Sequence, residues 1–440
     1  MSSSPSTIRV AIIGGGLAGA ALLRGLLRYP HIAVDMYESR PAFREEGPGL
    51  SFTTSTQAIL AAIDPELELC LDRAGAVSTS FEVRTASGPH TGRRIEVNGL
   101  EAPGAKKIVG RQAFLTEMLS GMPPRMMHPG ARISSVTDLS PGGHQGLLLT
   151  FADGSQKKYD IVVGADGTHG FTRGLVLGGD EALVSPHSTG FWSLPMKVPL
   201  RRAQQAMGTR YLDPSNPRQI GWVGDGTGMI HNLLDNGNEV EIVVYGNMDD
   251  VEVAEEDGAS GASWAKLFTP DEFHEMFASN QLPVCQGMVD LIQSVYTVQV
   301  AAICQLEHTP APTYVTKNVC LIGDSAHSML PFQGASVSIA IEEALILSSL
   351  LGRLPSKAAI PAALQAYDQV CRPRAELATR SSAETGFLVT GRGPSVGLDA
   401  DLLQHQLRHK WDFLLEVDID AYRAAANVVM DQLLGAETWM

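Results

Sequence analysis

The glycine-rich turn near the N-terminus constrains the fold more than any other feature of this chain. Residues 10–13 are a short, β-branched apolar run bounded by glycine, which predicts a buried parallel strand. Gly14, Gly16 and Gly19 follow with the spacing GxGxxG and open a predicted helix over residues 17–27. In such a motif the first glycine permits a tight turn, the second lets the backbone approach a pyrophosphate, and the third lets the helix pack closely against the strand.

A carboxylate ends the next predicted strand. Residues 32–37 are again mostly apolar, and Glu38 follows nineteen residues after Gly19. A carboxylate in this place accepts hydrogen bonds from a ribose, while the free N–H groups at the helix N-terminus bind phosphate. Glycine is common in this chain, so the triplet alone would be weak evidence. A glycine-rich turn in an ordinary α/β domain does not explain the acid, and the combination therefore predicts a dinucleotide site.

Length, charge and cysteine content limit the class of protein. A chain of 440 residues exceeds the size at which one core usually stops growing, which predicts two domains. The net charge of −15 argues against nucleic acid or an anionic membrane as a partner. Five scattered cysteines without CxxC spacing indicate a reducing compartment and no metal site. Neither a secretory signal nor an uninterrupted apolar span is visible, so we expect a cytoplasmic location.

The pattern of strands and helices predicts a discontinuous first domain. Residues 1–180 read as the first part of an α/β, Rossmann-like domain, and a buried strand near residue 320 starts its return segment over residues 311–355. Between them, residues 181–310 are rich in strand-like runs and are typical of an inserted antiparallel β-sheet domain. Residues 356–440 are predicted to be helical. The acidic segment 249–263 reads as an exposed loop.

Two further polar residues stand at the ends of predicted strands. Arg111 lies between a short strand and a helix, where its side chain could reach a phosphate or a ribityl chain, although it could also be a surface cation. Asp166 follows the strand of residues 158–163, on the edge where an open α/β sheet binds ligands. A plain turn is the alternative for Asp166.

Taken in order, these motifs give the chain a family likeness. The matching segments are GGGLAG, GRQAFL, GADGTHGFTR, GDSAHSMLPFQGA, AYDQVCRPRA and WDFLLEVDID. The chain resembles the FAD-dependent, single-component aromatic hydroxylases, particularly the salicylate hydroxylase-like branch and its fungal polyketide-modifying relatives. Several separate matches in the right order are more specific than any single motif. The resemblance turns the predicted dinucleotide site into an FAD site.

The resemblance also implies roles for individual residues. The glycine motif would cradle the FAD pyrophosphate, Glu38 would hold the adenosine ribose, and Arg111 and Asp324 would reach the middle section and ribityl chain. The helix starting near Ala335 would point its N-terminus at the flavin ring, where it favours negative charge. The cofactor-binding candidates are Gly14, Gly16, Gly19, Glu38, Arg40, Gly49, Ser51, Arg111, Asp166, Asp324, Gly334, Ala335 and Val337.

The implied activity is monooxygenation. In this family NAD(P)H reduces the flavin, O2 adds to give a C4a-hydroperoxide, and one oxygen atom passes to an aromatic or polyketide-derived small molecule. No metal is required, and neither a GxSxG nor a HExxH motif is present. The oligomeric state expected is a monomer or a homodimer. A dehydrogenase that uses only a nicotinamide cofactor would leave the GDSAH segment unexplained.

The expected substrate pocket departs from the family pattern. Its candidates are Trp192, Pro195, His231, Pro331 and Phe332. Pro195 stands where fungal relatives carry an arginine that holds a phenolate, and proline offers neither charge nor donor. His231 is the candidate for proton transfer, with a histidine bonded to a neighbouring strand as the alternative.

Other residues near the flavin also differ from the family. Lys197 or Arg210 could replace the missing arginine. Ser336 and Ser338 stand where relatives carry a glycine and a glycine or asparagine, and their Cβ atoms could crowd a close backbone approach beside the flavin. His327 is expected to be structural. These departures leave open a protein that binds FAD but no longer hydroxylates, and instead directs a cyclisation or serves as a binding module.

Overall fold

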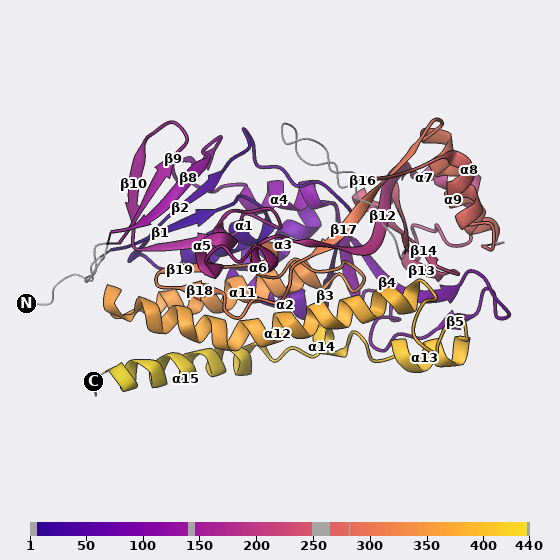
Figure 1. Cartoon of the computed structure of the whole chain (residues 1–440). Coiled ribbons are helices and arrows are strands. Elements are labelled where there is room, and N and C mark those ends of the chain that lie inside the picture. Colours follow the sequence, from indigo (N-terminus) through magenta and orange to yellow (C-terminus); the bar gives the residue numbers. More distant parts are fainter. Residues whose placement is uncertain (1–6, 140–145, 249–264, 281, 438–440) are drawn as a thin grey trace, which may run out of the picture.

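Figure 1 shows the computed structural model of the chain, which describes residues 7–139, 146–248, 265–280 and 282–437. The acidic segment 249–263 lies outside the described residues. The architecture combines a mainly parallel sheet, a small antiparallel sheet, a large mixed sheet and a layer of long helices.

The parallel sheet forms around the glycine motif. Its strands are β1 (Ile8–Ile13), β2 (Ile32–Glu38), β7 (Met127–Pro129), β11 (Ile161–Gly164), β18 (Val315–Thr316) and β19 (Val319–Leu321). Their order is β18-β19-β11-β1-β2-β7, with only β18 antiparallel to its neighbour. The predicted strands in β1, β2 and β19 are confirmed, and β19 places the return segment beside β11. The strand predicted over residues 158–163 is instead divided between β10 (Gln156–Tyr159) of the small sheet and β11.

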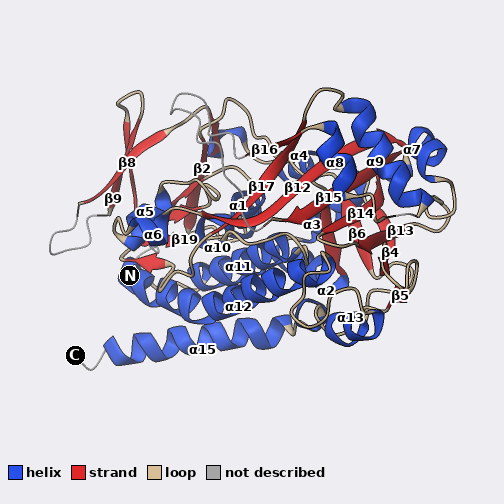
Figure 2. Ribbon diagram, turned by 45° about the vertical axis from the view of Figure 1, so that its right-hand side comes forward, coloured by secondary structure: helices blue, strands red, loops and turns tan. Residues whose placement is uncertain are grey.

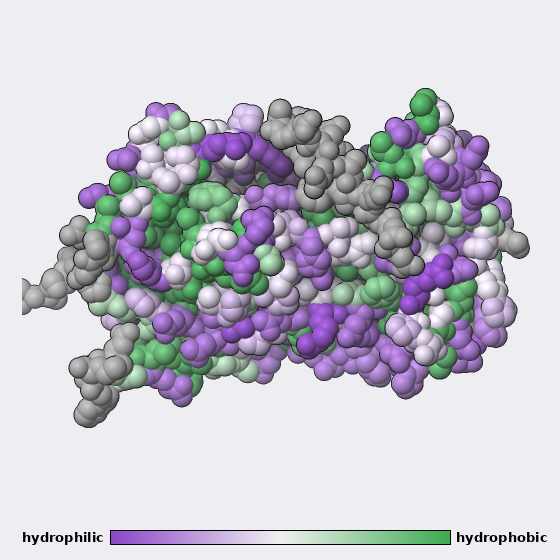
Figure 3. All heavy atoms as spheres, in the orientation of Figure 1, coloured by the Kyte–Doolittle hydropathy of each residue, from purple (hydrophilic) through white to green (hydrophobic). Residues whose placement is uncertain are grey.

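Helices cover this sheet in layers. Helix α1 (Leu17–Leu26) packs against α11 (Ala335–Gly352), and α12 (Ile360–Val389) runs along both α11 and α15 (Ile419–Glu437), as Figure 2 shows. Among the described helices, only α11 is long and apolar enough to cross a membrane, and 78% of it is buried inside the protein, as in a core helix. Hydrophilic residues predominate on the exposed band where α12 runs (Figure 3).

The other α-helices are shorter than α11, α12 and α15. They are α2 (Thr54–Ile63), α3 (Pro65–Arg73), α4 (Arg111–Leu119), α5 (Thr172–Leu177), α6 (Glu181–Val184), α7 (Leu200–Met207), α8 (Pro270–Met276), α9 (Pro283–Val295), α10 (Asp324–His327), α13 (Ala400–Leu407) and α14 (Asp412–Leu415). Helices α2 and α3 are separate because Asp64 ends α2 and caps α3, and Pro65 begins the new helix.

The large sheet is assembled from distant parts of the chain. The region after residue 181 supplies β12 (His187–Pro199), β13 (Arg218–Val223), β14 (Thr227–Leu234), β15 (Glu239–Asn247), β16 (Ala265–Phe268) and β17 (Val300–Glu307). The N-terminal region adds β3 (Leu50–Thr53), β4 (Val77–Thr85), β5 (Arg94–Ile95) and β6 (Lys106–Val109). The sheet is therefore not confined to residues 181–310, because β4 pairs in parallel with β13 and carries the N-terminal strands into it. The small sheet contains β8 (Ile133–Asp138), β9 (Leu147–Phe151) and β10 (Gln156–Tyr159).

Candidate active site

A cavity of about 430 Å³ lies between one face of the large sheet and the N-terminus of α11. The loop before β3, strands from both ends of the sheet and the segment leading into α11 supply its walls. The predicted residues among its lining are Gly49, Ser51, Arg111, Pro195, Pro331, Phe332, Gly334 and Val337. The structure thus brings cofactor and substrate candidates from four separate sequence regions to one place.

The N-terminus of α11 is open toward this cavity. Gly334 precedes the helix with φ +65, and no side chain caps the first turn. Ser336 and Val337 in that turn line the cavity. Because a helix of 18 residues carries partial positive charge at its N-terminus, this end favours an electron-rich group.

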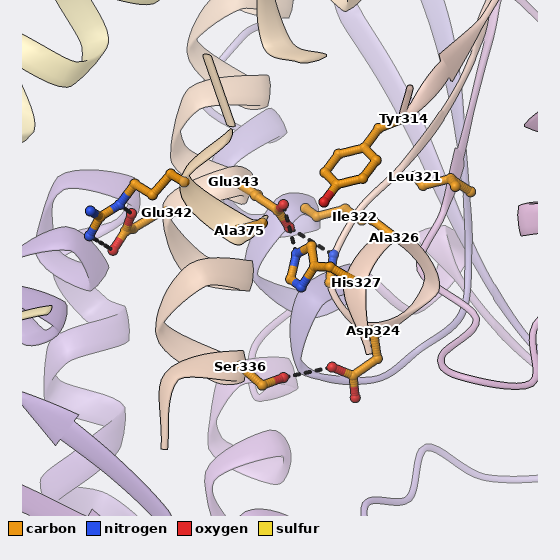
Figure 4. Close-up of polar contacts among 12 residues, drawn as sticks. Tyr314, Leu321, Ile322, Asp324, Ala326, His327, Ser336, Glu342, Glu343 and Ala375 are labelled. Atoms are coloured by element: carbon orange, nitrogen blue, oxygen red, sulfur yellow. Dashed lines mark hydrogen bonds and ion pairs between the residues drawn. The ribbon is translucent and has the colours of Figure 1, made fainter. Parts of the chain in front are cut away.

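The side chains of Ser336 and Ser338 point in different directions. Ser336 Oγ donates a hydrogen bond of 2.6 Å to Asp324 Oδ1, which fixes the carboxylate at the start of α10 (Figure 4). Ser338 instead accepts a hydrogen bond of 3.0 Å from Thr56 Oγ1 and is buried against α2. The prediction that Ser338 crowds the flavin is therefore wrong, since its side chain faces the helix layer.

The glycine turn is a close-packed cradle. Gly14 has φ +111, and a Cβ added there would lie 2.0 Å from Ala165 O; a Cβ on Gly19 would lie 2.2 Å from Gly14 O. Glu38 lies beside this turn, where its Oε2 accepts from Gly15 N at 3.0 Å and its Oε1 from Arg40 N at 2.8 Å. The glycine motif, Glu38 and Arg40 therefore lie together.

Glu45 links this cradle to the cavity and was not singled out from the sequence. Its Oε1 accepts a hydrogen bond of 3.3 Å from Leu17 N at the start of α1, and its Oε2 lies 3.3 Å from Arg111 Nη1. Asp166, in contrast, accepts hydrogen bonds from Thr172 N and Thr172 Oγ1 at the start of α5 and does not line the cavity. The sequence signal that could have identified Glu45 is its position as an acidic residue in a loop that also contains glycines and other charged residues.

His231 does not face the cavity, which corrects its prediction as the residue that transfers a proton. Its ring is fully buried on the opposite face of β14, stacked 6.2 Å from Trp222, whereas Ile230 and Asn232 face the cavity. Burial, followed by the nearby Arg218 charge, lowers the pKa of His231 to about 3. The ring is therefore neutral near neutral pH.

Trp192 is likewise excluded from the cavity wall. On β12, Ser193 and Pro195 face the cavity, and the alternate residue Trp192 packs in the second core against Phe268 and Phe277 at centroid distances of 5.1 and 6.4 Å. Strand residues alternate between faces, so Trp192 and Pro195 cannot line the same wall.

Replacing His231 with leucine tests its exclusion from the chemistry. Neither ring nitrogen has a hydrogen-bond partner among the described residues, so leucine removes unpaired polar atoms from an apolar core. We expect kcat and its pH profile to stay within about twofold of wild type, and the melting temperature to hold or rise. A loss of one limb of the pH profile would contradict this placement.

The residues suggested as substitutes for the missing arginine do not supply a cation to the cavity. Lys197 is exposed at a position opposite Glu241 in the pairing of β12 and β15, and Arg210 is exposed over the ring of Tyr211. The cavity is instead lined by Lys106, at the start of β6. Sequence analysis did not select Lys106.

Comparison with known proteins places this site in a family. The family described as "FAD binding domain" matches residues 268–382. A salicylate hydroxylase of Pseudomonas putida is 30% identical over 97% of this chain and 96% of its own length. This chain belongs to the salicylate hydroxylase family of FAD-dependent monooxygenases. The monooxygenase is also 29% identical to the 6-methylsalicylate 1-monooxygenase atA of Aspergillus terreus, over 98% of this chain and 95% of that protein.

Solved structures agree with the assignment. A salicylate hydroxylase in complex with its substrate superposes with a TM-score of 0.76 at 27% identity, covering 96% of this monooxygenase and 98% of that chain. The enzyme uses FAD, and NAD(P)H is the usual reductant of the family. These findings do not favour the alternative of a flavin-binding protein without oxygenase activity.

Proposed function

We propose that this monooxygenase inserts one oxygen atom from O2 into a small aromatic or polyketide-derived molecule bound between the large sheet and α11. The cavity carries this proposal, because its walls combine an open helix N-terminus with a mostly apolar sheet face that excludes water. When bound, FAD supplies the oxygen-transfer chemistry, and the chain's own residues hold and orient the reactants.

The residues for the cofactor form two groups in this proposal. The glycine motif, Glu38 and Arg40 bind the adenosine and pyrophosphate end, with Arg111 between the two groups. Asp324, Gly49, Ser51 and the turn of Gly334 to Val337 bind the ribityl chain and flavin. Gly14 has no room for a Cβ because the turn packs against the backbone of Ala165, which holds the turn at the start of α1 in one tight conformation. Asp166 serves α5 in this scheme, and residues 1–180 with 311–355 carry most of the cofactor contacts.

Removing either carboxylate tests the cofactor placement. Glu38→Ala and Asp324→Ala should each weaken FAD binding about 10- to 100-fold, the effect of losing one hydrogen bond to a charged group. The FAD dissociation constant, measured by flavin fluorescence, reports this change. Glu275→Ala is the control, since Glu275 is exposed on α8. If both variants bind FAD as tightly as wild type does, this placement of the cofactor is wrong.

Turnover tests the reaction itself. The FAD-loaded enzyme is given NAD(P)H and a panel of salicylates, neutral phenols, indoles and polyketide aldehydes, while oxygen uptake, product and released peroxide are measured. An oxygenated product formed with little peroxide supports the proposal. The proposal is contradicted if no compound raises NAD(P)H consumption above background, or if the consumption yields only peroxide.

A further inference from the structure

Lys106 is a buried cation on the wall of the cavity. It starts β6, its side chain is only 5% exposed, and it lines the cavity together with the neighbouring strands of the large sheet. Among the described residues, the other charged residues of the lining are Arg111 and Glu241. The character of the cavity therefore depends on how these three charges are compensated.

Two of the three charges already have partners in the protein. Arg111 lies 3.3 Å from the carboxylate of Glu45, and Glu241 accepts a hydrogen bond of 2.8 Å from Gly49 N. Lys106 has no carboxylate within 4.0 Å among the residues described. Its Nζ donates to Gln219 Oε1 and lies 4.3 Å from the centre of the Phe81 ring.

A row of polar side chains fixes the orientation of the amide beside Lys106. Gln219 Nε2 donates to Asn232 Oδ1 at 3.0 Å, and Asn232 lies directly opposite Glu241 in the pairing of β14 and β15. This donation turns Gln219 Oε1 toward Lys106, because one end of an amide donates while the other accepts. The row places a cation at one end of the cavity wall and a carboxylate at the other.

The neutral partners leave the ammonium incompletely satisfied. An ammonium has three donors, and Gln219 accepts from one of them. Burial lowers the pKa of Lys106 to about 7, because the charged form has lost water without gaining a counter-ion. An anion bound in the cavity would restore the charged state and accept the remaining hydrogen bonds.

We propose that Lys106 recognises the carboxylate of an aromatic carboxylic acid substrate, at a different wall of the cavity from Pro195. The inference rests on the proposed function for the location of the substrate, and what it adds is the residue that selects a carboxylate. A carboxylate is favoured over a phenolate because it remains ionised throughout the pH range in which Lys106 is protonated, whereas a free phenol does not. Phe81 and Trp411, whose ring centres lie 5.5 Å apart, line the same end of the cavity and offer apolar surface to an aromatic ring.

The test compares charged and neutral forms of the same molecule. Dissociation constants for salicylate with salicylamide, and for benzoate with benzamide, are measured by calorimetry on FAD-loaded protein without NAD(P)H. Wild type should bind each carboxylate more tightly than its amide. Lys106→Met should weaken carboxylate binding about 10- to 100-fold, the effect of one charge-assisted hydrogen bond, and change amide binding less than about threefold. Since binding is read without turnover, failure of the oxygenation assay would leave this result intact.

The neighbouring lysine provides a matched control. Lys107 follows Lys106 on β6, pairs with Asp72 at 2.6 Å and does not line the cavity. Lys107→Met removes the same charge from the same strand and should leave all four dissociation constants unchanged. Equal weakening of carboxylates and amides by Lys106→Met would show a structural role and overturn the proposal, as would a wild type that binds amides as tightly as carboxylates.

Wild-type protein alone gives a second test that does not depend on a variant folding. Carboxylate affinity should fall as pH rises above about 7, because free Lys106 then loses its proton, while amide affinity should not. Among the described residues, the other charged groups that line this cavity are Arg111, which pairs with Glu45, and Glu241, which accepts a hydrogen bond from Gly49 N. Carboxylate affinity that does not change between about pH 6 and 9 would overturn the proposal.

Discussion

Gly14→Ala is expected to abolish folded, FAD-loaded protein. The backbone at Gly14 has φ +111, and an alanine Cβ would lie 2.0 Å from the carbonyl oxygen and 2.4 Å from the carbonyl carbon of Ala165. Neither backbone can move freely, because Gly14 N donates to Tyr37 O at 2.8 Å and Ala165 N donates to Ile13 O at 2.7 Å. The clash therefore falls at the centre of the parallel sheet. We expect a loss of more than about 4 kcal/mol of unfolding free energy, seen as insoluble or unfolded protein.

Gly154→Ala separates steric clash from backbone strain. Gly154 has φ +82, also in the left-handed region, but nothing lies within 4 Å of the position that its Cβ would take. Its cost should be about 1 to 2 kcal/mol, from the conformation alone. The yield of soluble folded protein, and urea unfolding of each variant that folds, measure the difference. Equal losses would mean that the close approach of Gly14 to Ala165 contributes nothing.

The elements around Gly14 could be predicted because their information is local. A strand, a glycine turn, a helix and a second strand follow one another over residues 8–38, and the two strands are neighbours in the sheet. Glu38 lies beside the turn as the pattern predicts, with its Oε2 3.0 Å from Gly15 N. No pairing between remote segments is needed to bring these residues together.

The faces of the strands in the large sheet could not be assigned in the same way. Both faces of β12 and β14 are buried, one against the cavity and one against the second core. Such strands are apolar on both sides and lack the alternation that marks an exposed face. The sequence therefore gave no basis for choosing between Trp192 and Ser193, or between His231 and Asn232, and an assignment shifted by one residue turns each side chain to the wrong side.

Lys106 was missed for a different reason. Its partners Gln219 and Phe81 lie on β13 and β4, which pair in parallel although more than 130 residues separate them in sequence. In the run Lys106-Lys107-Ile108-Val109 the two lysines are equivalent by sequence, yet one is buried in the cavity wall and the other pairs with Asp72. Only the register of β6 against β4 distinguishes them.

Glu343→Ala is expected to cost about 3 to 5 kcal/mol of unfolding free energy, because it removes one partner of a buried charged pair. Glu343 is fully buried on α11, where Oε2 accepts from Gly323 N at 2.8 Å and Oε1 lies 2.8 Å from His327 Nε2 (Figure 4). Alanine leaves both groups without this acceptor next to Asp324. Glu343→Gln keeps the shape and one acceptor, so urea unfolding should show a smaller loss. A loss below about 1 kcal/mol for Glu343→Ala would contradict the structural role of this pair.

The same pair predicts how stability changes with pH. Burial by itself would lower the pKa of His327, but the charge and hydrogen bond of Glu343 outweigh it and raise the pKa above its usual 6.5. The protonated pair therefore contributes fully below about pH 6.5, and its contribution is lost as pH rises through the folded pKa, since the folded state holds its proton longer than the unfolded chain. In Glu343→Gln the charge that raises the pKa is gone and burial remains, so the slope of stability with pH should flatten or reverse. Unfolding free energies measured by urea between about pH 6 and 9 give this slope for each variant. In His327→Gln the slope should disappear, because the titrating group is absent. A wild-type slope that survives unchanged in both variants would assign the pH dependence to other groups and leave the His327 and Glu343 contact as neutral hydrogen bonding.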